Sequence, residues 1–166
     1  MLSFSLNHTN FMVRTAGIAV RDGHVLLQRL TDQSFWFTPG GRVEIDESSP
    51  EALLREMREE LNAEVQAERL LWIVEHFFID ERLARFHELG LYWLMTFPDD
   101  SPWNTLAGVR SVQVDGHAME YAWRPIADLA KITVYPEFLP EGLKQLPTTP
   151  EHVILRRRAP EVGAPA

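Results

Sequence analysis

The chain has 166 residues, of which 45% are apolar, so it is long enough to bury the core of one globular domain. Its formal net charge of −8 disfavours non-specific binding to nucleic acid, and the basic run at 156–158 is too short to change that. The absence of cysteine excludes disulfides and thiolate metal sites. No apolar run approaches the roughly 20 residues of a membrane span, and the N-terminus lacks an export signal. We therefore expect a cytoplasmic protein with a single domain over 1–158 and a disordered tail over 159–166.

The first elements are predicted to be two paired strands. Apolar runs over 11–21 and 24–30 flank Asp22-Gly23, a dipeptide that favours a tight hairpin turn. The following stretch, TDQSFWFTPGG, is polar apart from three aromatic residues and ends in Pro-Gly-Gly, which is typical of a loop.

A helix is predicted to begin after Ser48. Ser48 and Glu51 have the spacing of a capping box, and Pro50 is tolerated in a first turn. Asn62 is suited to the left-handed residue that ends a helix. The residues at helical spacing that would form its buried stripe are Ala52, Leu53, Met57 and Leu61.

The second half of the chain is predicted to be mainly strands. Long apolar runs at 69–80 and 85–97 favour two paired strands, with further strands near 120–123 and 151–157. A shorter helix is expected within 136–146. This order of elements predicts a mixed α/β fold, with a mixed sheet packed between helices.

The helix that follows the glycines carries an unusual number of carboxylates. Glu56, Glu59 and Glu60 are spaced so that they share one face, where like charges repel one another. One interpretation is a solvated surface with Arg55 and Arg58 as neutralising partners. The other is a site for Mg²⁺ or Mn²⁺, which prefer oxygen ligands and keep waters that substrate phosphates replace.

This stretch resembles the Nudix box, G-x5-E-x7-R-E-U-x-E-E-x-G-U, where U is aliphatic. Six of its seven fixed letters are present at the right spacing, and Asn62 stands where glycine is usual. The matching residues are Gly41, Glu47, Arg55, Glu56, Glu59 and Glu60, with Met57 and Ala63 in the aliphatic positions. The resemblance implies the Nudix fold and metal-dependent hydrolysis of a nucleoside diphosphate linked to another group.

The resemblance also implies roles for individual residues. Its metal-ligand positions are Glu56, Glu59, Glu60 and the carbonyl of Gly40. Arg55 would orient a helix glutamate, and Glu47 would stabilise the junction of loop and helix. Apart from the resemblance, the backbone exposed at Gly40 and Gly41 could supply another ligand or let a phosphate chain approach closely.

The general base and the substrate contacts stay open at this stage. Glu60 and Glu56 are the first candidates for the base, and Glu88, which interrupts an apolar strand, is a second one. Trp36 and Phe37 are candidates for stacking on a nucleobase, although core packing is the alternative for aromatic residues. His76, which also lies within an apolar run, is a further polar residue with either a functional or a merely structural role.

The predicted substrate is a small nucleotide, either a nucleoside di- or triphosphate or a nucleotide sugar. In the family that the box resembles, a proline after the box marks many ADP-ribose hydrolases, and a tyrosine slightly further on marks many dinucleoside polyphosphate hydrolases. The corresponding region here, FFIDERLAR, has neither residue. An idle nucleotide sensor is the alternative function, and an RNA-decapping hydrolase ranks third because the chain is acidic. The family resemblance also suggests a homodimer.

Overall fold

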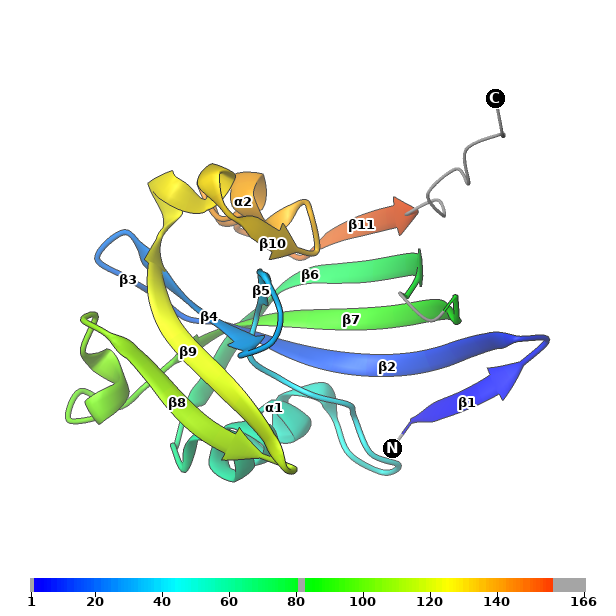
Figure 1. Ribbon diagram of the computed structural model, residues 1–166, viewed down its shortest axis with the longest axis horizontal. Helices are drawn as coiled ribbons and strands as arrows, with labels where there is room; N and C mark the ends of the chain where they lie inside the picture. The colour runs from blue at the N-terminus through cyan, green and yellow to red at the C-terminus, as the bar shows by residue number, and fades with distance from the viewer. Residues whose placement is uncertain (1, 81–82, 157–166) are drawn as a thin grey trace.

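The computed structural model describes residues 2–80 and 83–156, which form two sheets (Figure 1). In the first sheet, β2 pairs with β7 in parallel, and β6 pairs with β11 in parallel, whereas the other pairs are antiparallel. Its strands, in spatial order, are β1 (Ser3–Leu6), β2 (Thr9–Ile18), β7 (Arg85–Thr96), β6 (Gln66–Ile79) and β11 (Glu151–Arg156).

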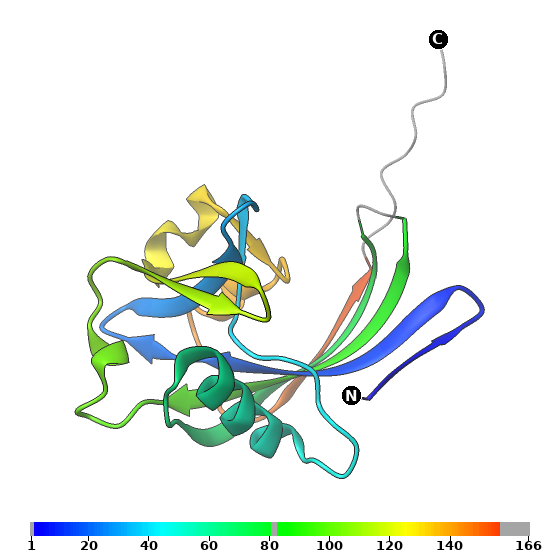
Figure 2. The same ribbon diagram turned by 60° about the horizontal axis from the view of Figure 1, so that its bottom comes forward.

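The second sheet is also mixed, because β10 and β5 are parallel and its other pairs are antiparallel. Its order is β10 (Thr133–Tyr135), β5 (Phe35–Phe37), β4 (His24–Leu30), β9 (His117–Pro125) and β8 (Val109–Val114), and β3 (Val20–Arg21) pairs with β4. Figure 2 shows the β8–β9 hairpin above the main helix, while the far ends of β1, β2, β6, β7 and β11 extend to the other side.

The main helix is α1 (Ser49–Leu61), with 13 residues. The others are the short α2 (Leu139–Gly142) and two 3-10 turns, η1 (Pro102–Asn104) and η2 (Ile126–Lys131). In the ranges that the structure describes, no helix is both long and apolar enough to span a membrane.

Two apolar clusters hold these layers together. One joins both sheets to α2 and includes Ile18, Trp36, Trp72 and Tyr92. The other joins α1 to both sheets and includes Leu53, Met57, Met95, Trp103 and Tyr121. Burial of such side chains stabilises the fold by about 1.5–3 kcal/mol each. The second cluster packs the buried stripe of α1 against both sheets, and this packing fixes the helix that carries Glu56, Glu59 and Glu60.

The predicted mixed α/β fold class is confirmed, and several details differ. The expected strand over 11–21 is divided into β2 and β3, and the predicted aromatic loop contains β5. The helix expected within 136–146 has four residues, because prolines and a glycine interrupt that stretch. Strands β1, β8 and β10 were not predicted. The tail at 159–166 lies outside the described residues, as do Arg157 and Arg158.

Candidate active site

The loop that precedes α1 runs alongside β2. The N–H of Gly17 donates to the carbonyl of Pro39 at 2.8 Å, and the N–H of Thr15 donates to the carbonyl of Gly41 at 2.9 Å. Gly40 has a φ of 136°, and a Cβ there would lie 2.3 Å from the carbonyl oxygen of Thr15. Only glycine fits this close approach, so the Pro-Gly-Gly sequence fixes the loop against the sheet.

Both ends of α1 have the caps that the sequence predicts. The N–H of Ser48 donates to the carboxylate of Glu51 at 2.9 Å, within a capping box. Asn62 is left-handed, with φ 47° and ψ 45°, and its N–H donates to the carbonyl of Arg58 at 3.0 Å. The predicted stripe is buried, and it consists of Ala52, Leu53, Met57 and Leu61. The caps and the stripe together determine where the glutamates point.

Glu56 packs directly onto the glycine loop. A Cβ added to Gly41 would lie 2.1 Å from the carboxyl carbon of Glu56, far inside van der Waals contact. The side chain of Glu56 is only 14% exposed. Gly41 therefore serves to admit a carboxylate of the helix into contact with the loop backbone.

Arg55 ties the carboxylates of the box together. Its guanidinium forms a bidentate ion pair with Glu47, with Nε–Oε1 at 2.8 Å and Nη2–Oε2 at 3.0 Å. Its Nη1 donates to Glu56 at 2.8 Å and to Glu59 at 3.1 Å, and its Nη2 donates to the carbonyl of Arg42 at 3.0 Å. The pKa of Glu47 is lowered chiefly by its hydrogen bond to Arg55. Loop and helix are thus joined at one side chain.

Glu60 lies on the inner side of α1 and has a different partner. The hydroxyl of Tyr121 on β9 donates to Oε2 of Glu60 at 3.0 Å. Burial raises the pKa of Glu60 to about 7, against the opposing effect of the Tyr121 hydrogen bond, and the charge of Glu56 raises it further. Burial also raises the pKa of Glu56, although Arg55 acts in the opposite direction. A nearby cation would stabilise the charged forms of both carboxylates.

The donor set fits a hard divalent cation, because it consists of carboxylate and carbonyl oxygens. Glu59 is 60% exposed, so its side chain is free to turn once Arg55 releases it. Over residues 2–80 and 83–156, no three acids or histidines are already gathered closely enough to enclose a metal. The carbonyl of Gly40 accepts a hydrogen bond from Arg14 at 3.1 Å. A cation would therefore have to draw in the box glutamates and share Gly40 with a guanidinium.

The predicted aromatic contacts separate into two cases. Trp36 is 2% exposed, and the guanidinium groups of Arg29 and Arg124 lie 4.7 and 4.2 Å from its ring centroid. This burial favours core packing, the alternative interpretation of Trp36, over stacking on a nucleobase. Phe37 is half-buried, and its ring centroid lies 5.8 Å from the guanidinium of Arg14, beside the glycine loop. Phe37 also packs against the second apolar cluster, and its stacking on a nucleobase stays a prediction.

Glu88 lies in the first sheet rather than on the helix. It pairs with Met12 of β2, two residues from Arg14, so Glu88 and Arg14 share one face of the sheet. His76 pairs with Glu88 across β6 and β7 and is buried. The structure thus brings Glu88 to the face that carries Arg14, whereas three of the four box glutamates lie on α1 and Glu47 lies on the loop before it.

Two residues of this region were not predicted as site residues. Arg14 donates from one Nη to the carbonyls of Thr38 and Gly40, at 3.2 and 3.1 Å. Tyr121 donates to Glu60 across the gap between β9 and α1. The sequence signal for Arg14 was a single charge inside an apolar strand. Tyr121 had no signal, because nothing along the chain relates β9 to the helix.

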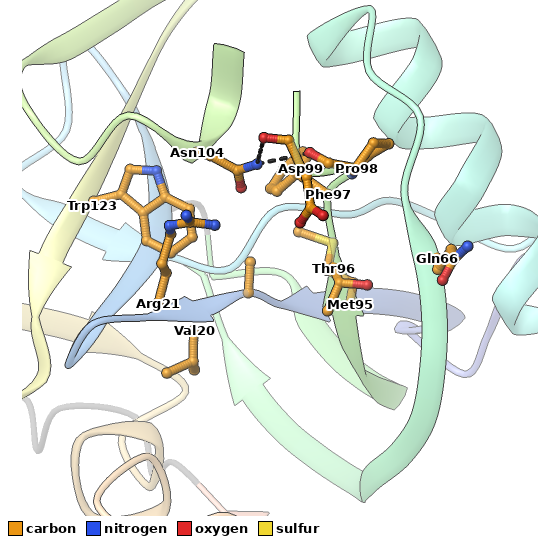
Figure 3. Close-up of a pocket in the computed structure, with 11 residues that line it drawn as sticks. Val20, Arg21, Gln66, Met95, Thr96, Phe97, Pro98, Asp99, Asn104 and Trp123 are labelled. Carbon is orange, nitrogen blue, oxygen red and sulfur yellow. Dashed lines mark hydrogen bonds between the residues drawn. The ribbon is translucent and has the colours of Figure 1, made fainter. Parts of the chain in front are cut away.

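A cavity of about 470 Å³ lies elsewhere, beside the end of β7 (Figure 3). Its lining includes Arg21, Thr96, Asn104 and Trp123 and none of the predicted site residues. Trp123 and Tyr121 are two residues apart on β9 and therefore point to the same face. The cavity is a neighbour of the box rather than a part of it.

The fold is mixed α/β, and its glycine loop packs on a helix whose carboxylates are bound by Arg55. This is the arrangement that the resemblance to the Nudix box predicts. Residues 12–146 match the family model described as the NUDIX domain, which is more than half of the 166 residues. The chain therefore belongs to the Nudix family, and the prediction of a Nudix hydrolase is confirmed.

The chain is also similar in sequence to two pyrophosphohydrolases and in fold to a solved structure. The chain is 25% identical over 136 residues to an RNA pyrophosphohydrolase of Haemophilus influenzae (strain PittEE), covering 75% of this chain and 69% of that protein. It is 49% identical over 53 residues to a CTP pyrophosphohydrolase of Escherichia coli (strain K12), covering 30% and 39%. The solution structure of the E. coli ORF135 protein is 27% identical, with a TM-score of 0.51, and covers 82% of this chain and 89% of its own.

Proposed function

We propose that this protein is a divalent-metal-dependent pyrophosphohydrolase that cleaves a nucleoside triphosphate or another nucleoside diphosphate linked to a small group. The observation that carries the proposal is the pair of partly buried carboxylates, Glu56 and Glu60, beside Arg55 and the glycine loop. The two similar proteins from H. influenzae and E. coli are both named pyrophosphohydrolases, which supports the type of bond.

Each residue of the box has a part in this proposal. Glu56, Glu59, Glu60 and the carbonyl of Gly40 would hold Mg²⁺ or Mn²⁺, which supplies charge neutralisation and a more acidic bound water. Arg55 keeps Glu56 and Glu59 oriented. Either Glu60 or Glu56 would accept the proton of the attacking water, because a carboxylate within reach of that water can act as its general base.

The expectations about partners belong to the same proposal. The substrate is a small nucleotide rather than a nucleic acid, since the chain carries a net charge of −8. Phe37 and Glu88 are the proposed substrate contacts outside the box, with Gly41 at the phosphates. We further propose that the enzyme acts in the cytoplasm as a homodimer.

The test is release of phosphate or pyrophosphate from a panel of nucleotides, with Mg²⁺, with Mn²⁺ and with chelator. The panel contains nucleoside di- and triphosphates, nucleotide sugars, dinucleotides and a 5′-triphosphorylated RNA. Metal-dependent turnover of one small-nucleotide group is the expected result. Tight binding of nucleotide without turnover would replace the proposal with a sensor, and preference for the RNA would replace the substrate class.

A further inference from the structure

Tyr121 lies in the core between β9 and the inner face of α1. Its side chain is 1% exposed, and its hydroxyl reaches Oε2 of Glu60 at 3.0 Å. On β9 it is held between two partners, Gln28 on β4 and Arg110 on β8. A side chain in this position, at the centre of three paired strands, has little freedom to move.

The ring of Tyr121 is fixed by a tryptophan that also holds the end of the helix. Trp103 packs edge-on against Tyr121, with ring centroids 5.6 Å apart. Its Nε1–H donates to the carbonyl of Leu61, the last residue of α1, at 3.2 Å. Its own carbonyl accepts from Nε1 of Trp123 at 2.8 Å. The hydroxyl of Tyr121 is therefore held at a constant position relative to α1.

The donors to the box glutamates differ in charge. Glu56 and Glu59 accept from the guanidinium of Arg55, which is a cation itself. Glu60 accepts from a neutral phenol, which occupies only Oε2. A neutral donor orients a carboxylate without repelling an incoming metal ion, and it leaves the second oxygen available.

We propose that Tyr121 is a positioning residue, which holds Glu60 in the rotamer that presents its carboxylate to the divalent cation. This inference rests on the proposed function, because it assumes that Glu60 is a metal ligand. Hydrogen-bonding partners of metal ligands typically contribute about 10- to 100-fold to metal affinity. Tyr121 acts only through Glu60 and does not touch the substrate.

The experiment is a calorimetric titration of Mn²⁺ into the full chain without nucleotide. Tyr121→Phe retains the ring and its packing but removes the hydroxyl, so the expected result is Mn²⁺ binding weakened by about 10- to 100-fold. In turnover assays the concentration of Mn²⁺ needed for half-activation rises by a similar factor. The KM for nucleotide at saturating Mn²⁺ stays at the wild-type value.

Two further variants make the test specific. Tyr92→Phe removes the hydroxyl of another buried tyrosine, which belongs to the other apolar cluster, and should leave Mn²⁺ affinity unchanged. In a Glu60→Gln background, Tyr121→Phe should have no additional effect on Mn²⁺ affinity, because the carboxylate ligand that Tyr121 positions has been removed.

The outcomes separate this inference from the proposed function. If wild-type protein binds Mn²⁺ and hydrolyses nucleotide while Tyr121→Phe binds Mn²⁺ equally well, the role of Tyr121 is overturned alone. An equal loss of affinity from Tyr121→Phe with and without Glu60 overturns it as well, since that pattern indicates a general structural effect. Wild-type protein that neither binds Mn²⁺ nor turns over any nucleotide overturns both.

Discussion

Arg55 carries the largest share of the polar contacts around the box. One guanidinium reaches Glu47, Glu56 and Glu59, so three carboxylates on the loop and the helix are held in register. Their spacing in the sequence predicted that the helix glutamates share a face, but not their different exposures. Glu56 is 14% exposed and Glu59 is 60% exposed, which suits a fixed ligand and a movable one.

Gly41 is a residue at which one methyl group should matter. Gly41→Ala places a Cβ 2.1 Å from the carboxyl carbon of Glu56, so the loop or the carboxylate must shift. Because a displacement of about 1 Å at a reacting centre can cost about 100-fold, we expect turnover to fall by about that factor. Steady-state kinetics at saturating metal measures it. Wild-type turnover in a folded Gly41→Ala protein would contradict the packing described here.

Glu60 predicts a pH dependence of stability in the absence of metal. The pKa of Glu60 is raised from 4.5 to about 7, so between these values the folded state binds a proton that the unfolded state lacks. Stability from this group is complete below about pH 4.5 and is lost as the pH rises to about 7. Glu60→Gln should reduce this slope and be more stable than wild type at pH 8. The free energy of unfolding of both proteins is measured by urea denaturation with chelator at a series of pH values. Parallel pH profiles would contradict the raised pKa of Glu60.

At the scale of the element, α1 was predictable because its signals are local. The capping box, the proline, the apolar stripe and the final asparagine all lie within or beside the helix, and all are found where predicted. The short strands were not predictable in the same way. Strand β5, Phe35–Phe37, has three residues, which is too few for an alternating pattern, and its parallel partner β10, Thr133–Tyr135, is distant in sequence.

Asn62 allows the C-terminal cap of α1 to be tested. Its φ of 47° is costly for a β-branched residue, so Asn62→Val should lower the free energy of unfolding by about 1–2 kcal/mol. Asn62→Gly should match or exceed wild-type stability, because glycine adopts this conformation freely. Chemical denaturation of the three proteins makes the comparison. Equal stability of the valine and glycine variants would show that the cap is not left-handed.

At the scale of the whole molecule, the mixed α/β class followed from the order of elements, whereas the division into two sheets did not. The site arises where elements from distant parts of the chain meet, with Arg14 from β2, the box from α1 and Tyr121 from β9. The box motif identifies only the helix and its loop. Arg14 and Tyr121 are joined to it by tertiary packing, which a single sequence does not reveal.

The single domain predicted for 1–158 stays a prediction. The family match extends over 12–146, and each of the two apolar clusters includes residues from both sheets. These observations favour one cooperative unit, because no boundary separates the clusters along the chain.

The central claim is that the carboxylates of α1 hold the cation on which hydrolysis depends. Its most direct test is the turnover of nucleoside triphosphates by wild-type protein and by Glu56→Gln, each with Mn²⁺ and with chelator, alongside their thermal midpoints. We predict that wild-type protein turns over nucleotide with Mn²⁺ and not with chelator. We also predict that Glu56→Gln falls to the chelator background while it unfolds within a few degrees of wild type. A folded Glu56→Gln protein with undiminished, Mn²⁺-dependent turnover would contradict the claim.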